Sequence, residues 1–131
     1  MPAEGVAAVK LTQHVETSGY AIRAYQPGEV LINDERHHTS VIVAPNRLIT
    51  GWAPQRLEEL RAEDLEPLLA LAPTIVLIGT GPTLRFPEPA VLAPLHQRGI
   101  GVEVMDTGAA CRTYAVLMSE DRQVAAALLL A

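Results

Sequence analysis

The sequence is poor in cysteine, with Cys111 the single one among 131 residues. One cysteine forms neither an internal disulfide bond nor the multi-cysteine set of a structural metal site. The histidines add no metal signal, because His37 and His38 are adjacent and would point to opposite faces of a strand. We therefore expect neither a metal site nor a cofactor.

Aromatic residues and positive charge are also scarce. Aromatic side chains make up 4% of the chain, and ten Lys and Arg stand against fifteen Asp and Glu, which gives a net charge of −5. Proteins bind single strands of nucleic acid on aromatic platforms, and they follow the phosphate backbone with clustered cations. We therefore expect no nucleic acid partner.

Long apolar runs are absent as well. No run in the sequence approaches the about 18 residues that span a bilayer. The first twenty residues show neither the pattern of a secretory signal nor that of a mitochondrial transit peptide. These absences predict a protein without a membrane span and with a cytoplasmic location.

The remaining composition is typical of one globular domain. Hydrophobic residues make up 49% and charged residues 19% of the chain, proportions that match neither a disordered chain nor a coiled coil. A length of 131 residues is the usual size of one domain with one core. We predict a single domain over residues 1–131.

Short strands separated by turn residues fill the N-terminal half. Pro27–Gly28 and Pro45–Asn46 interrupt runs of alternating or β-branched residues, and Asn33–Arg36 form a polar tip. Strands joined by such short turns are antiparallel neighbours. The predicted strands are 9–15, 20–25, 30–32, 39–44 and 48–52.

The second half changes to helical spacing. Leu65, Leu68 and Leu69 predict a helix, with Asp64 as its N-cap and Pro67 in its first turn, where a missing N–H costs little. The following run, 74–78, is short and β-branched, as in a strand that is buried on both faces.

Two crossovers follow from the remaining elements. One unit consists of strand 74–78, helix 89–98 and strand 100–105, and the next of strand 100–105, helix 108–118 with Thr107 as its cap, and strand 124–130. Such crossovers make the strands parallel and place the helices on the sheet. The predicted fold is an α/β domain with a mixed β-sheet, antiparallel in its N-terminal half and with two C-terminal βαβ crossovers.

A candidate site lies where two loops, 79–82 and 106–108, leave the parallel strands. Ligands of open α/β sheets collect at this edge, and the free N–H groups of a helix start suit an anion, as do arginines. The candidate anion- or ligand-binding residues are Thr80, Gly81, Arg85, Asp106, Thr107, Gly108 and Arg112. None of them is assigned a catalytic role.

The same residues allow a purely structural interpretation. Gly79 and Gly81 lack the third glycine of a dinucleotide fingerprint, so they can serve a tight turn alone. Arg85 or Arg112 can pair with Asp106, which would make the loops a structural clasp. If Asp106 caps a backbone amide instead, a positive spot remains at the edge.

Cys111 allows two interpretations. It lies near the start of a helix and beside Arg112, a position that can lower the pKa of a thiol. However, no histidine is placed in the sequence to act as its base, and free cysteines are among the most buried residue types. We predict a packed side chain rather than a nucleophile.

Two motifs in order resemble domain-of-unknown-function family 498. They are residues 78–81 (IGTG) with 85–87 (RFP), and residues 101–107 (GVEVMDT) with 109–114 (AACRTY). The resemblance extends from about residue 20 to the C-terminus. It implies a three-layer α/β fold around a mixed sheet and a strand at 124–130. It also marks Thr80, Arg85, Asp106, Thr107 and Arg112 as motif positions.

The resemblance also carries an expectation about function, because animal relatives of the family include a mitochondrial assembly factor for respiratory complex I. The first hypothesis is a non-enzymatic binding or assembly module whose partners are respiratory complex subunits or assembly factors, or a second copy bound through the first fifty residues. The alternative is a small-molecule or anion-binding domain, an enzyme or a sensor, with its site at Gly79–Pro82 and Asp106–Arg112. A third interpretation is a domain whose motifs serve folding alone. An exposed apolar patch would favour the first, and a deep pocket holding Arg85 and Arg112 the second.

Overall fold

The computed structural model describes residues 19–131. The strand expected at 9–15 lies outside the described residues. The strands are β1 (Ile22–Gln26), β2 (Glu29–Ile32), β3 (Glu35–His37), β4 (Val41–Ala44), β5 (Arg47–Ile49), β6 (Ile75–Thr80), β7 (Gly101–Met105) and β8 (Val124–Leu129). The helices are α2 (Glu66–Leu71), α3 (Pro89–Gln97) and α4 (Thr107–Ser119), and two short 3-10 turns, η1 (Leu57–Glu59) and η2 (Ala62–Leu65), precede α2. Within residues 19–131, no helix has the length and apolar character needed to cross a membrane.

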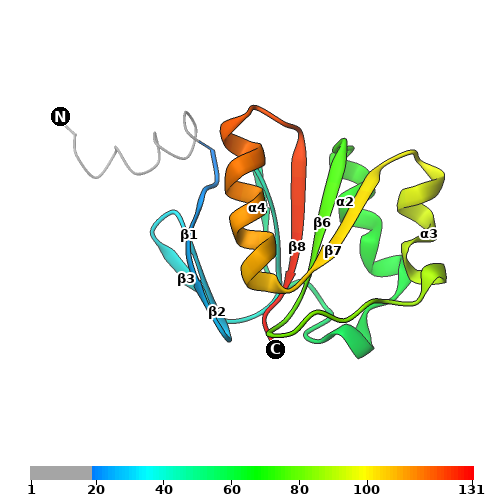
Figure 1. The fold of residues 1–131 in the computed structure, drawn as a ribbon, viewed down its shortest axis with the longest axis horizontal. Coiled ribbons are helices and arrows are strands. Elements are labelled where there is room, and N and C mark those ends of the chain that lie inside the picture. The colour runs from blue at the N-terminus through cyan, green and yellow to red at the C-terminus, as the bar shows by residue number, and fades with distance from the viewer. Residues whose placement is uncertain (1–18) are drawn as a thin grey trace.

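A mixed sheet of five strands forms the centre of the molecule, in the order β5-β4-β8-β6-β7 (Figure 1). Strand β6 runs parallel to both β7 and β8, whereas β4 runs antiparallel to β5 and β8. Both predicted crossovers are therefore confirmed. The second one passes over β6, because α4 leaves β7 and returns the chain to β8 on the far side of β6.

The strand expected at 124–130 is confirmed as the central strand β8. All of its side chains are buried, because layers cover both faces of the sheet. Alternate residues contribute to two different cores: Ala125, Ala127 and Leu129 to one, Ala126 and Leu128 to the other. Small alanines at the centre of the sheet let the flanking helices pack closely.

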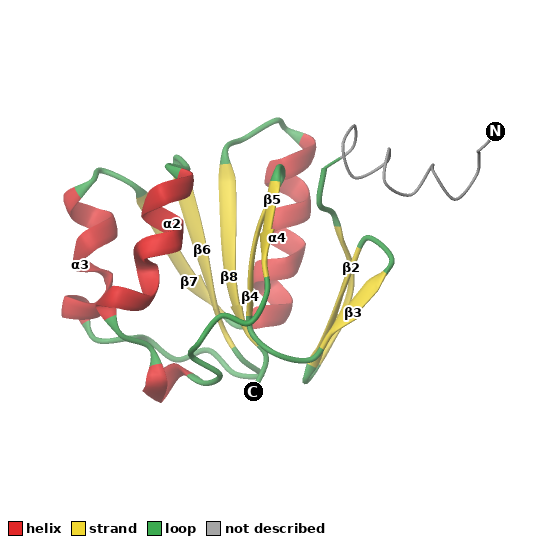
Figure 2. Ribbon diagram, turned by 180° about the vertical axis from the view of Figure 1, so that it is seen from behind, coloured by secondary structure: helices red, strands yellow, loops and turns green. Residues whose placement is uncertain are grey.

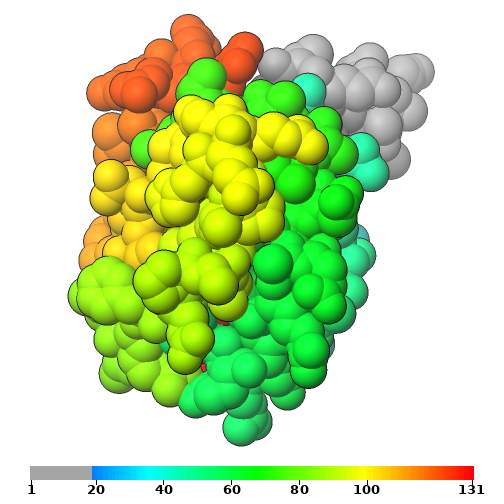
Figure 3. All heavy atoms as spheres, turned by 90° about the vertical axis from the view of Figure 1, so that its right-hand side faces the viewer, coloured from blue at the N-terminus to red at the C-terminus, as the bar shows by residue number. Residues whose placement is uncertain are grey.

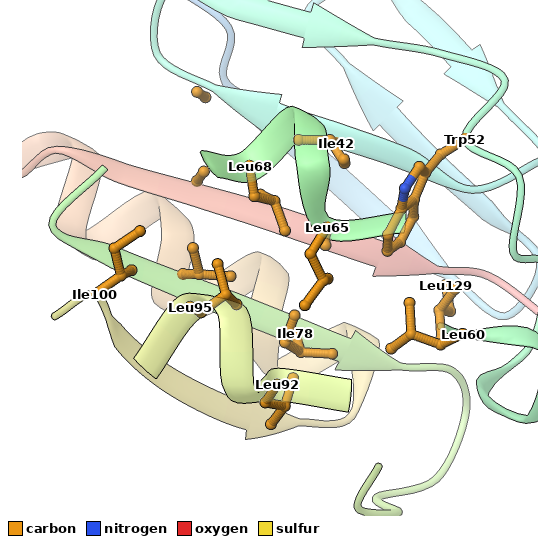
Figure 4. Close-up of a cluster of buried hydrophobic side chains, with 14 residues drawn as sticks. Ile42, Trp52, Leu60, Leu65, Leu68, Ile78, Leu92, Leu95, Ile100 and Leu129 are labelled. Atoms are coloured by element: carbon orange, nitrogen blue, oxygen red, sulfur yellow. The ribbon is translucent and has the colours of Figure 1, made fainter. Parts of the chain in front are cut away.

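Three layers result, as the family resemblance implied. Helices α2 and α3 cover one face of the five-stranded sheet, and α4 together with a small sheet covers the other (Figures 1 and 2). The core under α2 and α3 includes Trp52 (Figure 4). Its indole Nε1–H donates to the carbonyl oxygen of Asp64 over 2.9 Å. The core under α4 includes Tyr114, which is fully buried and whose hydroxyl donates to the carbonyl oxygen of Tyr20 over 2.7 Å.

The small sheet has the order β1-β2-β3 and is antiparallel throughout. The polar tip predicted at Asn33–Arg36 is shorter in the structure. Asn33 and Asp34 form the turn, whereas Glu35 and Arg36 belong to strand β3, so the prediction is wrong for these two residues. This strand pairs only with β2 among the described strands, so its mostly exposed polar side chains show no hydrophobic alternation. Strands β3 and β4, consecutive in sequence, lie in different sheets rather than side by side.

Two of the expected helix caps are wrong by position. Asp64 is not an N-cap; it is the third residue of η2, and its carboxylate accepts the backbone N–H of Arg61 over 2.9 Å. Asp106, not Thr107, caps α4, with its Oδ1 accepting the N–H of Ala109 over 2.8 Å. Both carboxylates still accept a backbone N–H at the start of a helix, Asp64 from the third position of η2 and Asp106 from the N-cap of α4.

Candidate functional site

The two predicted loops meet at the carboxyl edge of the parallel strands. The N–H of Thr107 donates to the carbonyl oxygen of Gly81 over 2.9 Å, and the N–H of Gly81 donates to the hydroxyl of Thr107 over 2.7 Å. The convergence follows from the parallel pairing of β6 and β7, which places their carboxyl ends side by side. This part of the prediction is confirmed.

The hydroxyl of Thr107 is the centre of this contact. It accepts from Gly81 and donates to the carbonyl oxygen of Leu129 over 2.6 Å, so it joins the loop after β6, the start of α4 and the end of β8. Thr107 is completely buried. This buried hydroxyl both donates and accepts a hydrogen bond within the protein. It therefore stabilises the contact between these segments and has little capacity left for a ligand.

Two glycines make this approach of backbone segments feasible. A Cβ at Gly79 would lie 2.9 Å from the hydroxyl and 3.0 Å from the Cα of Thr107. Gly81 has a φ of +97°, and a Cβ there would lie 2.6 Å from the carbonyl oxygen of Ala131. The glycines therefore serve close packing, as the structural interpretation of this loop holds.

Thr80 and Asp106 both bond to backbone groups. Thr80 is buried; its hydroxyl accepts the N–H of Arg85 over 3.2 Å and donates to the carbonyl oxygen of Thr83 over 2.7 Å. The carboxylate of Asp106 accepts the backbone N–H of Ala109. Within residues 19–131, Asp106 forms no ion pair with Arg85 or Arg112. Asp106 is therefore an amide cap, one of the two arrangements the sequence left open.

The structure does not bring Arg85 and Arg112 together. Arg85 turns to η1 and forms a two-pronged ion pair with Glu58, at 2.6 Å from Nη1 to Oε2 and 3.1 Å from Nη2 to Oε1. This hydrogen bonding lowers the pKa of Glu58 to about 2, with the nearby charges of Arg85 and Arg56 adding to the effect. Arg112 is exposed on α4 and forms no ion pair with another described residue.

The start of α4 is more occupied than expected. The prediction of unpaired N–H groups there is wrong for Ala109, which is capped by Asp106, and for Ala110, whose N–H donates to the carbonyl oxygen of Asp106. Gly108 is buried, and a Cβ there would lie 3.3 Å from two ring carbons of Tyr25. Sequence reasoning missed Tyr25, since it lies 83 positions before Gly108 and no local pattern links the two. Anion binding at this edge stays a prediction.

Cys111 is packed under α4. Its side chain belongs to the core cluster with Tyr114 and is 5% exposed. Burial raises the pKa of the thiol to about 12, and the charge of Arg112 opposes this only in part. The predicted packing role is confirmed by the burial of the residue.

Two cavities of the described residues lie elsewhere. One of about 590 Å³ lies at the opposite edge of the sheet, between Pro45, Pro73 and Gln123. The other, of about 410 Å³, lies between η1 and the loop that leads into α3, with Leu57 and Phe86 among its lining residues. Neither is lined by Arg85 or Arg112. The deep pocket that would favour a small-molecule site is therefore not formed by these two cavities.

A model of the family described as protein of unknown function (DUF498/DUF598) matches residues 22–129. The chain belongs to this family. A Xenopus tropicalis protein named NADH dehydrogenase (ubiquinone) 1 alpha subcomplex assembly factor 3 is 33% identical over 110 residues, which are 82% of this chain and 60% of that protein. The 13 kDa major membrane protein of Francisella tularensis is 28% identical over 103 residues, 78% of this chain and 84% of that protein. The crystal structure of a Bordetella parapertussis protein covers 88% of this chain and 98% of its own, with a TM-score of 0.82 and 37% identity.

Membership of the DUF498/DUF598 family agrees with the resemblance found in the two motifs and with the three-layer fold. The chain spans 60% of the length of the Xenopus relative, so the activity of that whole protein does not transfer directly. Four of the five motif positions, Thr80, Arg85, Asp106 and Thr107, form hydrogen bonds within this chain: Thr80 and Asp106 to nearby backbone groups, Arg85 and Thr107 to distant segments. The fifth motif position, Arg112 on α4, is exposed and forms no ion pair with the described residues.

Replacing Thr107 by valine tests the structural role of its hydroxyl. The substitution leaves the N–H of Gly81 and the carbonyl oxygen of Leu129 buried without that partner, and we expect the free energy of unfolding to fall by about 2–4 kcal/mol. Thr107→Ser keeps the hydroxyl and should cost less than about 1.5 kcal/mol. Urea denaturation measures both values. Equal losses in the two variants would contradict the role of the hydroxyl.

The thiol of Cys111 should react slowly in the folded protein. With a pKa raised to about 12 and a buried side chain, almost no thiolate is accessible at neutral pH. We expect alkylation by iodoacetamide to be slower by about a hundredfold or more than in a model peptide, and to speed up when denaturant is added. Alkylation of the native protein at the rate of the peptide would contradict the packing role.

Proposed function

We propose that this protein is a non-enzymatic binding module that assists the assembly of a larger protein complex, with the respiratory NADH dehydrogenase as the first candidate. One observation carries the proposal: Phe86 is 71% exposed and Leu84 50% exposed on a loop that is fixed by hydrogen bonds. Exposed apolar side chains on a fixed loop are typical of protein–protein contacts.

The comparisons support the same proposal from a second direction. The Xenopus relative is named as an assembly factor of NADH dehydrogenase, and this chain matches it over 82% of its own length. The partners we infer are subunits or assembly factors of that complex. Self-association through the first fifty residues stays a further prediction, supported by β1 and β3, which are edge strands of the small sheet among the described residues. We also propose a cytoplasmic location, although the Francisella relative is named a membrane protein.

Affinity purification from the source organism tests the proposed function. The full chain is tagged at its native locus, and the cytosolic and membrane fractions are purified separately. We expect subunits or assembly factors of NADH dehydrogenase to copurify from the cytosolic fraction, and a deletion strain to accumulate less of the assembled enzyme. Normal enzyme levels in the deletion strain, together with no copurifying protein, would contradict the proposal.

Weak anion binding at the carboxyl edge is the second candidate. It is favoured by Asp106, which caps Ala109 and leaves Arg112 without an acidic partner among the described residues. The ion pair of Arg85 with Glu58 and the capped N–H groups limit the positive charge that remains there. Any anion would therefore be held mainly by Arg112, with low affinity.

A phosphate titration checks this second candidate. At low salt we expect a dissociation constant near the millimolar range, which corresponds to about −4 kcal/mol. The amide resonances of Gly81, Thr107 and Gly108 should shift in the wild type, and they should shift less in Arg112→Ala. Unmoved resonances in the wild type, or equal shifts in the variant, would leave the loops with a structural role alone.

A further inference from the structure

The loop between β6 and α3 is held at two points. Inside the loop, the hydroxyl of Thr80 bonds to the N–H of Arg85 and to the carbonyl oxygen of Thr83. Outside it, the guanidinium of Arg85 bonds to both carboxylate oxygens of Glu58 on η1. Such a loop is already ordered before any partner arrives, so binding through it costs little conformational entropy.

This arrangement presents the only phenylalanine of the chain to solvent. Phe86 directly follows Arg85, and its side chain is 71% exposed although aromatic residues are scarce in this protein. Leu84, on the other side of Arg85, is 50% exposed. Neither residue belongs to the two cores. A partner that buries the phenyl ring would therefore remove apolar surface that folding leaves in water.

A groove lies next to Phe86. Its volume is about 410 Å³, and Leu57, Leu60 and Val91 supply apolar lining between η1 and α3. Figure 3 shows the hollow between the yellow-green loop and the green segment that contains η1 and η2. Phe86 and the adjacent Pro87 form the wall on the side of the loop. A space of this size and lining accepts one large apolar side chain.

The charged side chains that line the groove are both carboxylates, Glu58 and Glu88. Glu58 is neutralised by Arg85, with Arg56 also close enough to lower its pKa. Glu88 is the N-cap residue of α3, but its carboxylate accepts no capping hydrogen bond and forms no ion pair with any of residues 19–131. The exposed carboxylate of Glu88 is therefore available to a cation at the rim.

We propose that this surface, the Phe86 groove (Leu57, Leu60, Phe86, Glu88 and Val91), docks a segment of a protein partner that carries a large apolar side chain next to a lysine or arginine. The apolar side chain fills the space beside Phe86, and the cation pairs with Glu88. This inference rests on the proposed function as a protein-binding module and names the contact surface and the chemistry of the partner.

Selection of short random peptides displayed on phage against the immobilised full chain tests the proposal. We expect the selected sequences to combine an aromatic or large aliphatic residue with a neighbouring lysine or arginine. Phe86→Ser should weaken binding of a selected synthetic peptide by about tenfold or more, as loss of a central aromatic anchor does. Glu88→Lys should weaken the same peptide and, in a new selection, favour acidic sequences instead.

Matched substitutions on the other face of the sheet provide the controls. Val116→Ser removes a side chain that is 55% exposed on α4, and Glu103→Lys reverses an exposed charge on β7 opposite Leu77. Both should bind the selected peptide like the wild type, and all variants should keep the same thermal unfolding midpoint. Peptides without basic residues, no enriched sequence at all, or equal losses in Val116→Ser and Phe86→Ser would overturn the proposal.

Repeating the affinity purification with Phe86→Ser and Glu88→Lys separates this inference from the proposed function. Loss of the copurifying subunits in both variants, with retention in Val116→Ser, supports docking at the groove. Subunits that remain bound to both groove variants would overturn the groove and leave the assembly function standing. If the full chain copurifies only with a second copy of itself through this surface, the groove is occupied by that second copy in a homodimer, and the proposed partner chemistry is wrong.

Discussion

The contact between Thr107 and Gly81 is the constraint on which the carboxyl edge of the parallel strands depends. A single buried hydroxyl joins the end of β8, the start of α4 and the loop after β6. A Cβ at Gly79 would lie 2.9 Å from this hydroxyl, and a Cβ at Gly81 would lie 2.6 Å from the carbonyl oxygen of Ala131, so neither position has room for a side chain. At the carboxyl edge, where many α/β folds bind ligands, these polar groups of Thr107, Gly81 and Leu129 bond to one another.

Hydrogen bonds also hold the loop that follows β6. Thr80 holds the first part of the loop, and the ion pair between Arg85 and Glu58 ties its later part to η1. The ion pair is exposed, so its contribution to stability is small. Its consequence is geometric: it determines where Phe86 lies, beside a groove with an acidic rim. Two residues of the predicted ligand site, Thr80 and Arg85, thus hold the loop that carries this exposed apolar side chain.

The comparisons with known proteins show a shared fold among proteins that carry different names. The Bordetella structure shares the fold of this chain at 37% identity. The names of the relatives differ, one an assembly factor and one a membrane protein. A fold of this kind does not by itself specify an activity. What a family member binds depends on its exposed residues, and in this chain Phe86 is the most exposed of the large hydrophobic residues among those described.

The sequence by itself determined the class of fold, because periodicity and turn residues act locally. The uninterrupted run of β6, the helix that ends before Gly99 and the alternation of β7 predicted the crossovers, and parallel strands necessarily bring their following loops to one edge. Only the tertiary structure decided the partners of the site residues. Arg85 bonds to Glu58, 27 positions away, and Thr107 bonds to Leu129, 22 positions away. Side chains choose partners by distance in space, and a local sequence pattern carries no information about that distance.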